Sequence, residues 1–334
     1  MVTFIEKLLF LKKKESKQLK NILIKGAGVG GLTVAYMLQQ KGASVTVSAP
    51  LCSPIGTASW YAGGMLAPYC ERENAEQIVE DLGIQAIEWW CKTLPNLVIR
   101  NGTLVVAPTR DKVELERFLM RTHNHKIIKG TEIAHLESDF AERFNCALFY
   151  ENEAHLDPRK ALITLKENLI QNGARFVDVE TTETNFDIII DATGIARLGK
   201  DKNIRGVRGE MLLVRSTDIK LVRPIRLLHP RFPVYVVPRQ DNIFMIGATM
   251  IESDFDGAIS ARSMMELLNA AYTLHPAFAE AEIVETGVGV RPCYPDNFPS
   301  VYKHGNYISI NGFYRHGFLL SPEMAKRAMK LALE

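Results

Sequence analysis

The chain has 334 residues, of which 47% are hydrophobic and 23% are charged, a composition typical of a globular protein of about two domains. Its formal net charge of +2 gives no electrostatic basis for binding nucleic acid. Its five cysteines and eight histidines are scattered without CxxC or HxxxH pairs, so the sequence predicts no metal site and free thiols in a reducing, cytoplasmic setting.

Residues 1–19 are a basic extension that precedes the first predicted strand. The apolar segment 8–11 is too short for a secretory signal, and the lysines follow this segment instead of preceding it. We expect a poorly ordered tail. Because no apolar run of the chain is long enough to span a bilayer, we expect no stable association with a membrane.

The ordered part of the chain begins with the pattern of a βαβ unit. Residues 21–25 are apolar and β-branched, as in a buried parallel strand, and residues 32–40 have the periodicity of an amphipathic helix. Gly42 is a stop signal for this helix, and a second strand is predicted over 43–47. The glycine-rich turn 26–31 joins the first strand to the helix.

Each glycine of this turn has a physical role in holding a dinucleotide. Gly26 allows a tight turn, Gly28 lets a pyrophosphate approach the backbone, and Gly31 lets the helix pack closely on the strand. The free N–H groups and the positive dipole end of the helix attract phosphate. Because strand, helix and strand flank the glycines at this spacing, the pattern favours a nucleotide site over a glycine-rich turn without a ligand.

Helices and strands alternate along the rest of the chain. Helices are predicted over 74–93, 112–123, 157–172 and 261–274, and a last helix is predicted to start at Ser321 and Pro322. Strands are predicted over 104–107, 176–179, 186–194, 211–215, 234–238, 243–248 and 307–311. The strand over 186–194 ends in a glycine turn, as the first strand does, which favours a parallel sheet with a ligand beyond its carboxyl ends.

These elements predict an α/β protein of two domains that interleave along the chain. A Rossmann-like domain with helices on a parallel sheet is expected over 20–80, 150–205 and 286–334. A smaller α+β substrate domain with a mostly antiparallel sheet is expected over 81–149 and 206–285.

Two arginines, Arg291 and Arg315, each stand between glycines beside an apolar strand. Arginine binds a carboxylate through two parallel hydrogen bonds, so such a pair near a nucleotide predicts an acidic substrate, although a surface ion pair is the commoner fate of one arginine. Tyr235 could add a hydroxyl to this pocket or pack in the core, and His316 could tune a cofactor or bond to backbone. No Ser-His-Asp, Cys-His or paired-carboxylate arrangement follows from the spacing, so we expect a cofactor to carry the chemistry.

Taken together, these segments resemble the D-amino-acid oxidase superfamily, and within it the glycine oxidases of thiamin biosynthesis. The resemblance covers about residues 20–330, with the segments in the order of the family. The matching segments are the glycine-rich turn, 59–68, 207–210, the strand of Tyr235, 246–250, Arg291-Pro292 and 314–317.

The resemblance implies a flavoprotein with noncovalently bound FAD in the Rossmann-like domain. Tyr235, Arg291 and Arg315 would hold the substrate. The residues expected to line the FAD are Gly26, Gly28, Val29, Gly30, Gly31, Ala49, Ala58, Ser59, Gly63, Gly64, Met65, Val179, Gly194, Phe313, Tyr314, Arg315, His316, Gly317, Phe318 and Leu319. Among them, the segment 313–319 would wrap the flavin ring.

The implied reaction is the oxidative deamination of glycine or another small amino acid, by hydride transfer to the flavin and reduction of O2 to H2O2. A homo-oligomer is expected by the same resemblance. Two alternatives stay open: an FAD-dependent D-amino-acid dehydrogenase, and a catalytically silent nucleotide-binding paralogue.

One position departs from the pattern. In dinucleotide-binding folds an acidic residue about 20 residues after the glycines receives the ribose hydroxyls, and here Ala49 stands at that position. Losing such a charge-assisted hydrogen bond costs about 1.5–3 kcal/mol, so weaker retention of FAD is expected. Ser48 could compensate in part.

Overall fold

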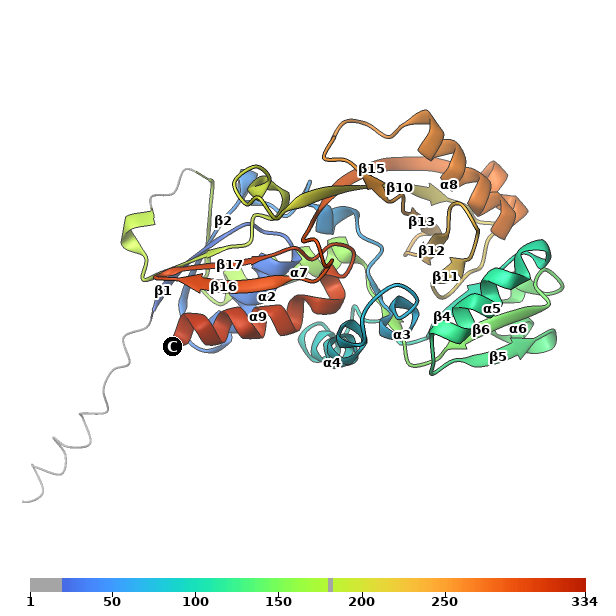
Figure 1. Cartoon of the computed structure of the whole chain (residues 1–334), viewed down its shortest axis with the longest axis horizontal. Coiled ribbons are helices and arrows are strands. Elements are labelled where there is room, and N and C mark those ends of the chain that lie inside the picture. The colour runs from blue at the N-terminus through green and yellow to red at the C-terminus, as the bar shows by residue number, and fades with distance from the viewer. Residues whose placement is uncertain (1–19, 180–182) are drawn as a thin grey trace, which may run out of the picture.

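The computed structural model describes residues 20–179 and 183–334 of the chain, so the predicted extension over 1–19 lies outside the described residues. Figure 1 shows two large sheets side by side along the long axis of the molecule. A small third sheet pairs β3 (Met65–Leu66) with β7 (Ala154–His155). In the chain, β3 directly precedes α3 (Pro68–Glu71).

The first large sheet has six strands in the order β16-β17-β9-β1-β2-β8. Its strands are β1 (Asn21–Lys25), β2 (Ser44–Ser48), β8 (Arg175–Val177), β9 (Ile188–Asp191), β16 (Ser300–His304) and β17 (Tyr307–Asn311). All the pairs are parallel except β16 with β17. The carboxyl ends of β1, β2 and β9 therefore meet at one edge, which is where such sheets bind ligands.

Helices cover this sheet and bury its apolar side chains. They are α2 (Val29–Gln40), α4 (Gln77–Thr93), α7 (Pro158–Gln171) and α9 (Gly317–Leu333), of which α9 packs against both α2 and α4. Ile22 and Ile24 of β1 and Leu32 of α2 are completely buried in the resulting core. The βαβ unit is thus formed by the residues that the hydrophobic pattern predicts.

The second large sheet has nine strands, in the order β14-β10-β13-β12-β11-β4-β6-β5, with β15 paired to β10. Its strands are β4 (Thr103–Val106), β5 (Lys126–Lys129), β6 (Cys146–Tyr150), β10 (Arg205–Arg215), β11 (Ile225–Leu227), β12 (Val234–Pro238), β13 (Ile243–Gly247), β14 (Ile251–Glu252) and β15 (Glu282–Cys293). The helices that accompany it are α5 (Lys112–Arg121), α6 (Thr131–Leu136) and α8 (Ala261–Leu274). Every pair is antiparallel except β11 with β4, which confirms the predicted combination of a parallel and a mostly antiparallel sheet.

The interleaved domain boundaries stay a prediction, but two of them fall inside elements of the structure. The expected boundary after residue 80 lies within α4, and Leu82 and Trp90 of that helix lie in the core of the first sheet. The expected boundary at 286 lies within β15, which pairs with β10 as far as Cys293. Both elements are continuous hydrogen-bonded segments, so neither contains a flexible linker of the kind that separates domains.

The last helix begins earlier than the sequence predicts. It starts at Gly317, and Pro322 lies inside it instead of at its first turn. A proline inside a helix has no N–H to donate to the carbonyl four residues earlier, here that of Phe318. The indole N–H of the buried Trp90 donates to this carbonyl at 2.7 Å and so replaces the missing donor.

We expect Trp90→Phe to lower the free energy of unfolding more when Pro322 is present than when it is replaced. In the Pro322→Ala background the backbone N–H of residue 322 can donate to the Phe318 carbonyl, so the indole is no longer needed as a donor. An unsatisfied buried carbonyl costs about 1–3 kcal/mol, and the coupling between the two substitutions should be of that size. Urea unfolding of the four variants measures it, and equal costs of Trp90→Phe in both backgrounds would contradict the role of the indole.

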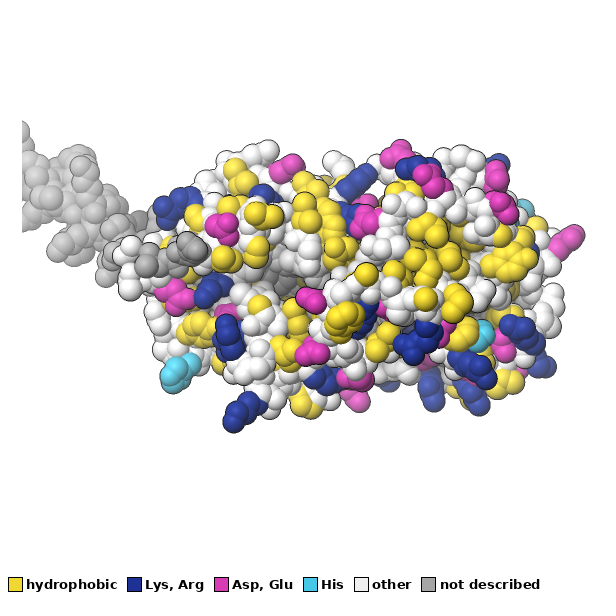
Figure 2. All heavy atoms as spheres, turned by 90° about the horizontal axis from the view of Figure 1, so that it is seen from above, with side chains coloured by type: hydrophobic (Ala, Val, Ile, Leu, Met, Phe, Trp, Pro, Cys, Tyr) yellow, Lys and Arg dark blue, Asp and Glu magenta, His cyan; other side chains and the backbone are white. Residues whose placement is uncertain are grey.

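Charges of both signs lie on the face seen in Figure 2, and lysines and arginines gather at its lower right. Among the described residues, no helix is both long and apolar enough to cross a membrane.

Candidate active site

A cavity of about 750 Å³ lies where the carboxyl ends of the first sheet face the second sheet. Gly28 and Ala49 line it from the ends of β1 and β2, and Tyr235 and Arg291 line it from β12 and β15. All the residues expected to bind FAD or substrate line this cavity except Gly31. The structure therefore brings together residues that the sequence spreads over nearly 300 positions.

The glycine-rich turn leaves no room for side chains. A Cβ atom at Gly31 would lie 2.0 Å from the carbonyl oxygen of Gly26, and one at Gly26 would lie 2.4 Å from that of Ala192 at the end of β9. Gly31 thus packs the helix on the strand, as predicted, and does not itself reach the cavity. Gly26 has φ of +106°, a conformation that glycine adopts without strain.

The N-terminus of α2 points its positive dipole end at the cavity. Gly28 is the N-cap residue and has no side chain with which to cap the helix, and no acidic side chain lies in the first turn. The hydroxyl of Ser59 accepts a hydrogen bond from the N–H of Val29 at 3.1 Å. This end of the cavity fits a pyrophosphate, since anions bind at uncapped helix N-termini.

Aromatic rings pack against two of the glycines that line the cavity. A Cβ atom at Gly30 would lie 2.6 Å from the ring of Phe313, and one at Gly63 would lie 2.7 Å from the ring of Tyr235. Arg239 fixes the backbone at Gly63, because its guanidinium donates to the carbonyls of Gly63 at 2.7 Å and Leu156 at 2.9 Å. The sequence analysis missed Arg239, although its place on the strand of Tyr235 is a signal that could have pointed to it.

Arg291 faces the cavity without an acidic partner. Its guanidinium donates to the carbonyl of Thr249 at 3.1 Å, and no carboxylate of the described residues lies within 4 Å of it. Burial lowers its pKa, and the proximity of Arg315 adds to this effect. A partly buried cation without a counter-ion is a ready site for an anionic ligand.

Arg315 reaches the same cavity but has an acidic partner. Its Nη2 lies 3.0 Å from Oε1 of Glu71, which is also 3.4 Å from Nη1 of Arg226. That both arginines hold the substrate stays a prediction, and the structure adds that the guanidinium of Arg315 also pairs with Glu71. The sequence analysis missed Glu71, and no local pattern around the short helix α3 distinguishes it.

His316 lies beside the same carboxylate, with Nδ1 3.4 Å from Oε2 of Glu71. Its pKa is about 4, because burial and the nearby Arg315 and Arg226 outweigh the attraction of Glu71. His316 is therefore neutral near pH 7 and forms no ion pair there. The prediction that its side chain bonds to backbone finds no support, since no such hydrogen bond is present for Nδ1 in the described structure.

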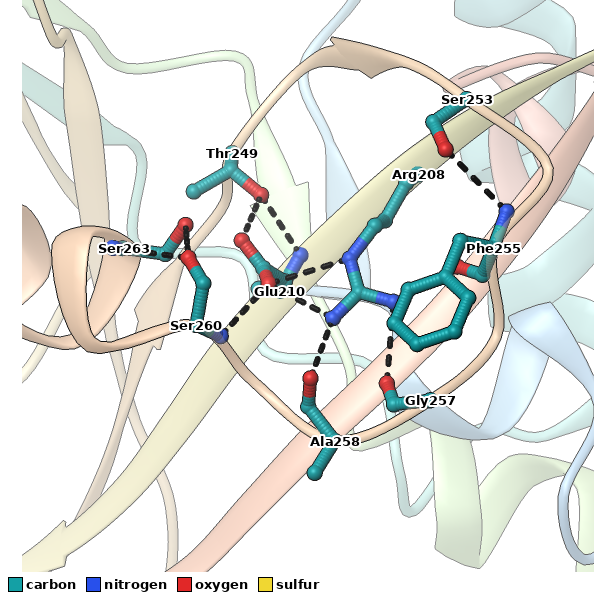
Figure 3. Close-up of polar contacts among 9 residues, drawn as sticks. All are labelled: Arg208, Glu210, Thr249, Ser253, Phe255, Gly257, Ala258, Ser260 and Ser263. Carbon is teal, nitrogen blue, oxygen red and sulfur yellow. Dashed lines mark hydrogen bonds and ion pairs between the residues drawn. The ribbon is translucent and has the colours of Figure 1, made fainter.

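A polar network centred on Glu210 joins β10 to the segment 249–260 (Figure 3). Glu210 accepts hydrogen bonds from the hydroxyl of Thr249 at 3.1 Å and the N–H of Ser260 at 3.1 Å, and its own N–H donates to the Thr249 hydroxyl at 2.9 Å. Both ends of the segment 249–260 are thereby tied to one residue. Because the Thr249 carbonyl accepts from Arg291, the network also fixes the position of the guanidinium.

Arg208 holds the middle of this segment. Its guanidinium pairs with Glu210 at 2.8 Å and donates to the carbonyls of Phe255, Gly257 and Ala258 at 2.6–2.9 Å (Figure 3). Both charged side chains of the pair are nearly inaccessible, at 5% for Arg208 and 0% for Glu210. The cavity wall formed by 249–260 is therefore built on a desolvated ion pair.

Comparisons with known proteins identify the family of the chain. Residues 21–331 match the model of the DAO family, described as FAD dependent oxidoreductase. A Rhizobium etli protein provisionally named thiamine biosynthesis oxidoreductase ThiO is 54% identical over 306 residues, which cover 91% of this chain and 94% of that protein.

Solved structures share the fold. The glycine oxidase from Geobacillus kaustophilus has a TM-score of 0.77 at 22% identity, covering 94% of each chain. The iminodiacetate oxidase from Chelativorans sp. BNC1 has a TM-score of 0.79 at 20% identity, covering 92% of this chain and 94% of that one. With the glycine-rich turn, the uncapped helix and the matched segments in one cavity, the chain belongs to the DAO family of FAD-dependent oxidoreductases.

Proposed function

We propose that this protein oxidises glycine or a similarly small amino acid with O2, for the synthesis of the thiazole of thiamin. The observation that carries the proposal is Arg291, a partly buried guanidinium that faces the cavity without an acidic partner among the described residues. The names of the relatives, a ThiO protein and several glycine oxidases, support the same substrate and pathway. The earlier expectations of a homo-oligomer and of a cytoplasmic location stay predictions.

The cavity offers a fitting environment to the pyrophosphate and to the flavin ring of FAD. The N-terminus of α2 would hold the pyrophosphate, and Phe313 and the turn at Gly63 would lie against the flavin ring. When bound, FAD would accept the two electrons and the hydrogen that the substrate's α-carbon loses. The residues of the chain then need only bind the amino acid and orient its α-carbon.

Arg291 would bind the substrate carboxylate through its paired N–H groups, with the Tyr235 hydroxyl as a second donor. Burial raises the pKa of Tyr235, so this hydroxyl keeps its proton near neutral pH. Fixing the carboxylate fixes the α-carbon, and such orientation supplies much of the rate without a protein base. The net reaction would be glycine, O2 and water giving glyoxylate, ammonia and H2O2.

An anaerobic spectrum tests the proposal. Protein reconstituted with FAD should lose its visible flavin absorbance when glycine is added without O2. If glycine, sarcosine and D-alanine all leave the absorbance unchanged, the proposal is wrong. Comparing H2O2 production with the reduction of an artificial dye then separates an oxidase from the D-amino-acid dehydrogenase alternative.

Ala49 is the feature that favours the silent nucleotide-binding alternative. It lines the cavity at the end of β2, where a carboxylate would receive the ribose hydroxyls. The hydroxyl of the adjacent Ser48 donates to the carbonyl of Asp178 at 3.3 Å, so only its lone pairs remain for the ribose. The unpaired Arg291 argues against a silent scaffold, which would have no use for a carboxylate anchor.

We expect Ala49→Glu to tighten FAD binding by about tenfold or more, since a hydrogen bond to a charged group contributes about 1.5–3 kcal/mol. Ala49→Gln is the matched control, because it has the same length without the charge and should give a smaller gain. Fluorescence titration of the apoprotein with FAD measures both. A dissociation constant for Ala49→Glu that equals that of the unchanged protein would show that residue 49 does not reach the ribose.

A further inference from the structure

Two acids and two arginines form a compact cluster at the substrate end of the cavity. Glu71, the last residue of α3, lies 3.0 Å from Arg315 and 3.4 Å from Arg226, measured from its Oε1 to the guanidinium nitrogens. Nη2 of Arg226 lies 2.8 Å from Oε2 of Glu73. All four side chains line the cavity, and their charges balance.

Glu71 stays ionised throughout the pH range in which the protein would work. Burial alone would raise its pKa, but Arg315, His316 and Arg226 outweigh burial and lower it to about 2. The carboxylate therefore neutralises Arg315 permanently, and no ordinary change of pH releases this guanidinium.

Arg291 and Arg315, two of the three arginines that line the cavity, differ in their partners although they reach the same wall. Nη1 of Arg291 donates to the carbonyl of Thr249, and Nη1 of Arg315 lies 3.5 Å from Sδ of Met250, the next residue. Burial raises the pKa of Tyr235, and both guanidinium groups oppose this increase, so both act on the same hydroxyl. One of these two cations is free for an anion and the other is occupied.

We infer that Glu71 is a specificity-determining residue, which restricts the cavity to substrates with one carboxylate by keeping Arg315 engaged. The inference deepens the proposed function and rests on it. A second carboxylate near Arg315 would meet the negative charge of Glu71 and would have to displace it from two arginines. A glycine-sized monocarboxylate on Arg291 avoids this contact.

The test compares diacids with their monoamides, which have nearly the same shape and one charge less. The probes are malonate, succinate and glutarate, each with its half-amide, so that several separations of the two groups are covered. Dissociation constants are measured on the FAD-loaded protein from the change in flavin absorbance. We expect the original protein to bind each half-amide at least as tightly as the diacid. In Glu71→Gln, at least one diacid should bind tenfold or more tightly than its half-amide.

Two controls separate the release of Arg315 from a general loss of negative charge. Asp256 also lines the cavity, is exposed and has no ion-pair partner among the described residues. Asp256→Asn therefore removes an equal charge without freeing an arginine, and it should leave the preference for diacid over half-amide within twofold. Adding Arg315→Gln to Glu71→Gln should abolish the gain.

Three results would overturn the inference: unchanged preferences in Glu71→Gln, the same gain in Asp256→Asn, or a gain that survives Arg315→Gln. If Glu71→Gln does not retain FAD, Glu71→Asp decides by the same comparison, since its shorter carboxylate loosens the contact with Arg315. Dissociation constants are measured without turnover, so the result of this test does not depend on whether the protein oxidises glycine. Failure to oxidise glycine contradicts the proposed function, whereas unchanged diacid binding contradicts only the role of Glu71.

Discussion

Arg291→Ala should lower kcat/KM for glycine by roughly 30-fold to several thousand-fold, mainly through a higher KM, while FAD stays bound. Removing one partner of a buried, hydrogen-bonded charge pair costs about 2–5 kcal/mol of binding, and each 1.4 kcal/mol is a factor of ten. The substrate carboxylate would lose its only unoccupied guanidinium in the described cavity. Steady-state kinetics with glycine, together with the FAD content of the purified variant, measure the effect.

Arg291→Lys is the control for this substitution, since lysine keeps the charge but cannot form the two parallel hydrogen bonds. We expect it to fall between the original protein and Arg291→Ala. Gly209 packs directly against the guanidinium, where a Cβ atom would lie 2.2 Å away, so the site is shaped for an arginine. Unchanged kinetics in Arg291→Ala would remove Arg291 from the substrate site.

The second large effect concerns stability. Arg208→Ala should lower the free energy of unfolding by about 3–5 kcal/mol, because it leaves the completely buried Glu210 as an uncompensated charge. Three backbone carbonyls of the segment 249–260 lose their donor at the same time. Denaturant unfolding at saturating FAD measures the difference.

The same strand supplies the matched control for this experiment. Arg215 ends β10 and pairs with Glu282 at 2.7 Å, but the two side chains are 46% and 63% exposed. Exposed pairs contribute only about 0–1 kcal/mol, so Arg215→Ala should have little effect. If Arg208→Ala costs no more than Arg215→Ala, the buried pair does not support the cavity wall.

Sequence reasoning succeeded where the signal is local. The predicted bounds 234–238, 261–274 and 307–311 agree with β12, α8 and β17, because alternation and helical periodicity are properties of neighbouring residues. The helix predicted over 157–172 agrees with α7, and Asp157 caps it by accepting from the N–H groups of residues 159 and 160. The family resemblance likewise placed the cavity residues, since its motifs keep their order along the chain.

Reasoning from the sequence failed where a distant residue changes a local rule. Pro322 is a helix starter by its local pattern, and it is acceptable inside α9 only because the indole of Trp90 donates to the carbonyl of Phe318, 228 residues later. The partner of Arg315 was likewise not predicted, because Glu71 lies 244 residues earlier in the chain. The start of β10 at Arg205 was missed because Arg208 and Glu210 interrupt the apolar alternation, although they are buried as a pair.

The ladder of β10 and β15 has a consequence for how tightly a small molecule can be held. Arg291 lies within this ladder, opposite Val207, so its backbone is fixed by regular hydrogen bonds on a long strand. The entropy of ordering the anchor is therefore lost once, when the chain folds, and not again at each encounter with a ligand. A ligand of only a few atoms has little interaction energy to offset such a loss, and a rigid anchor lets most of that energy appear as affinity.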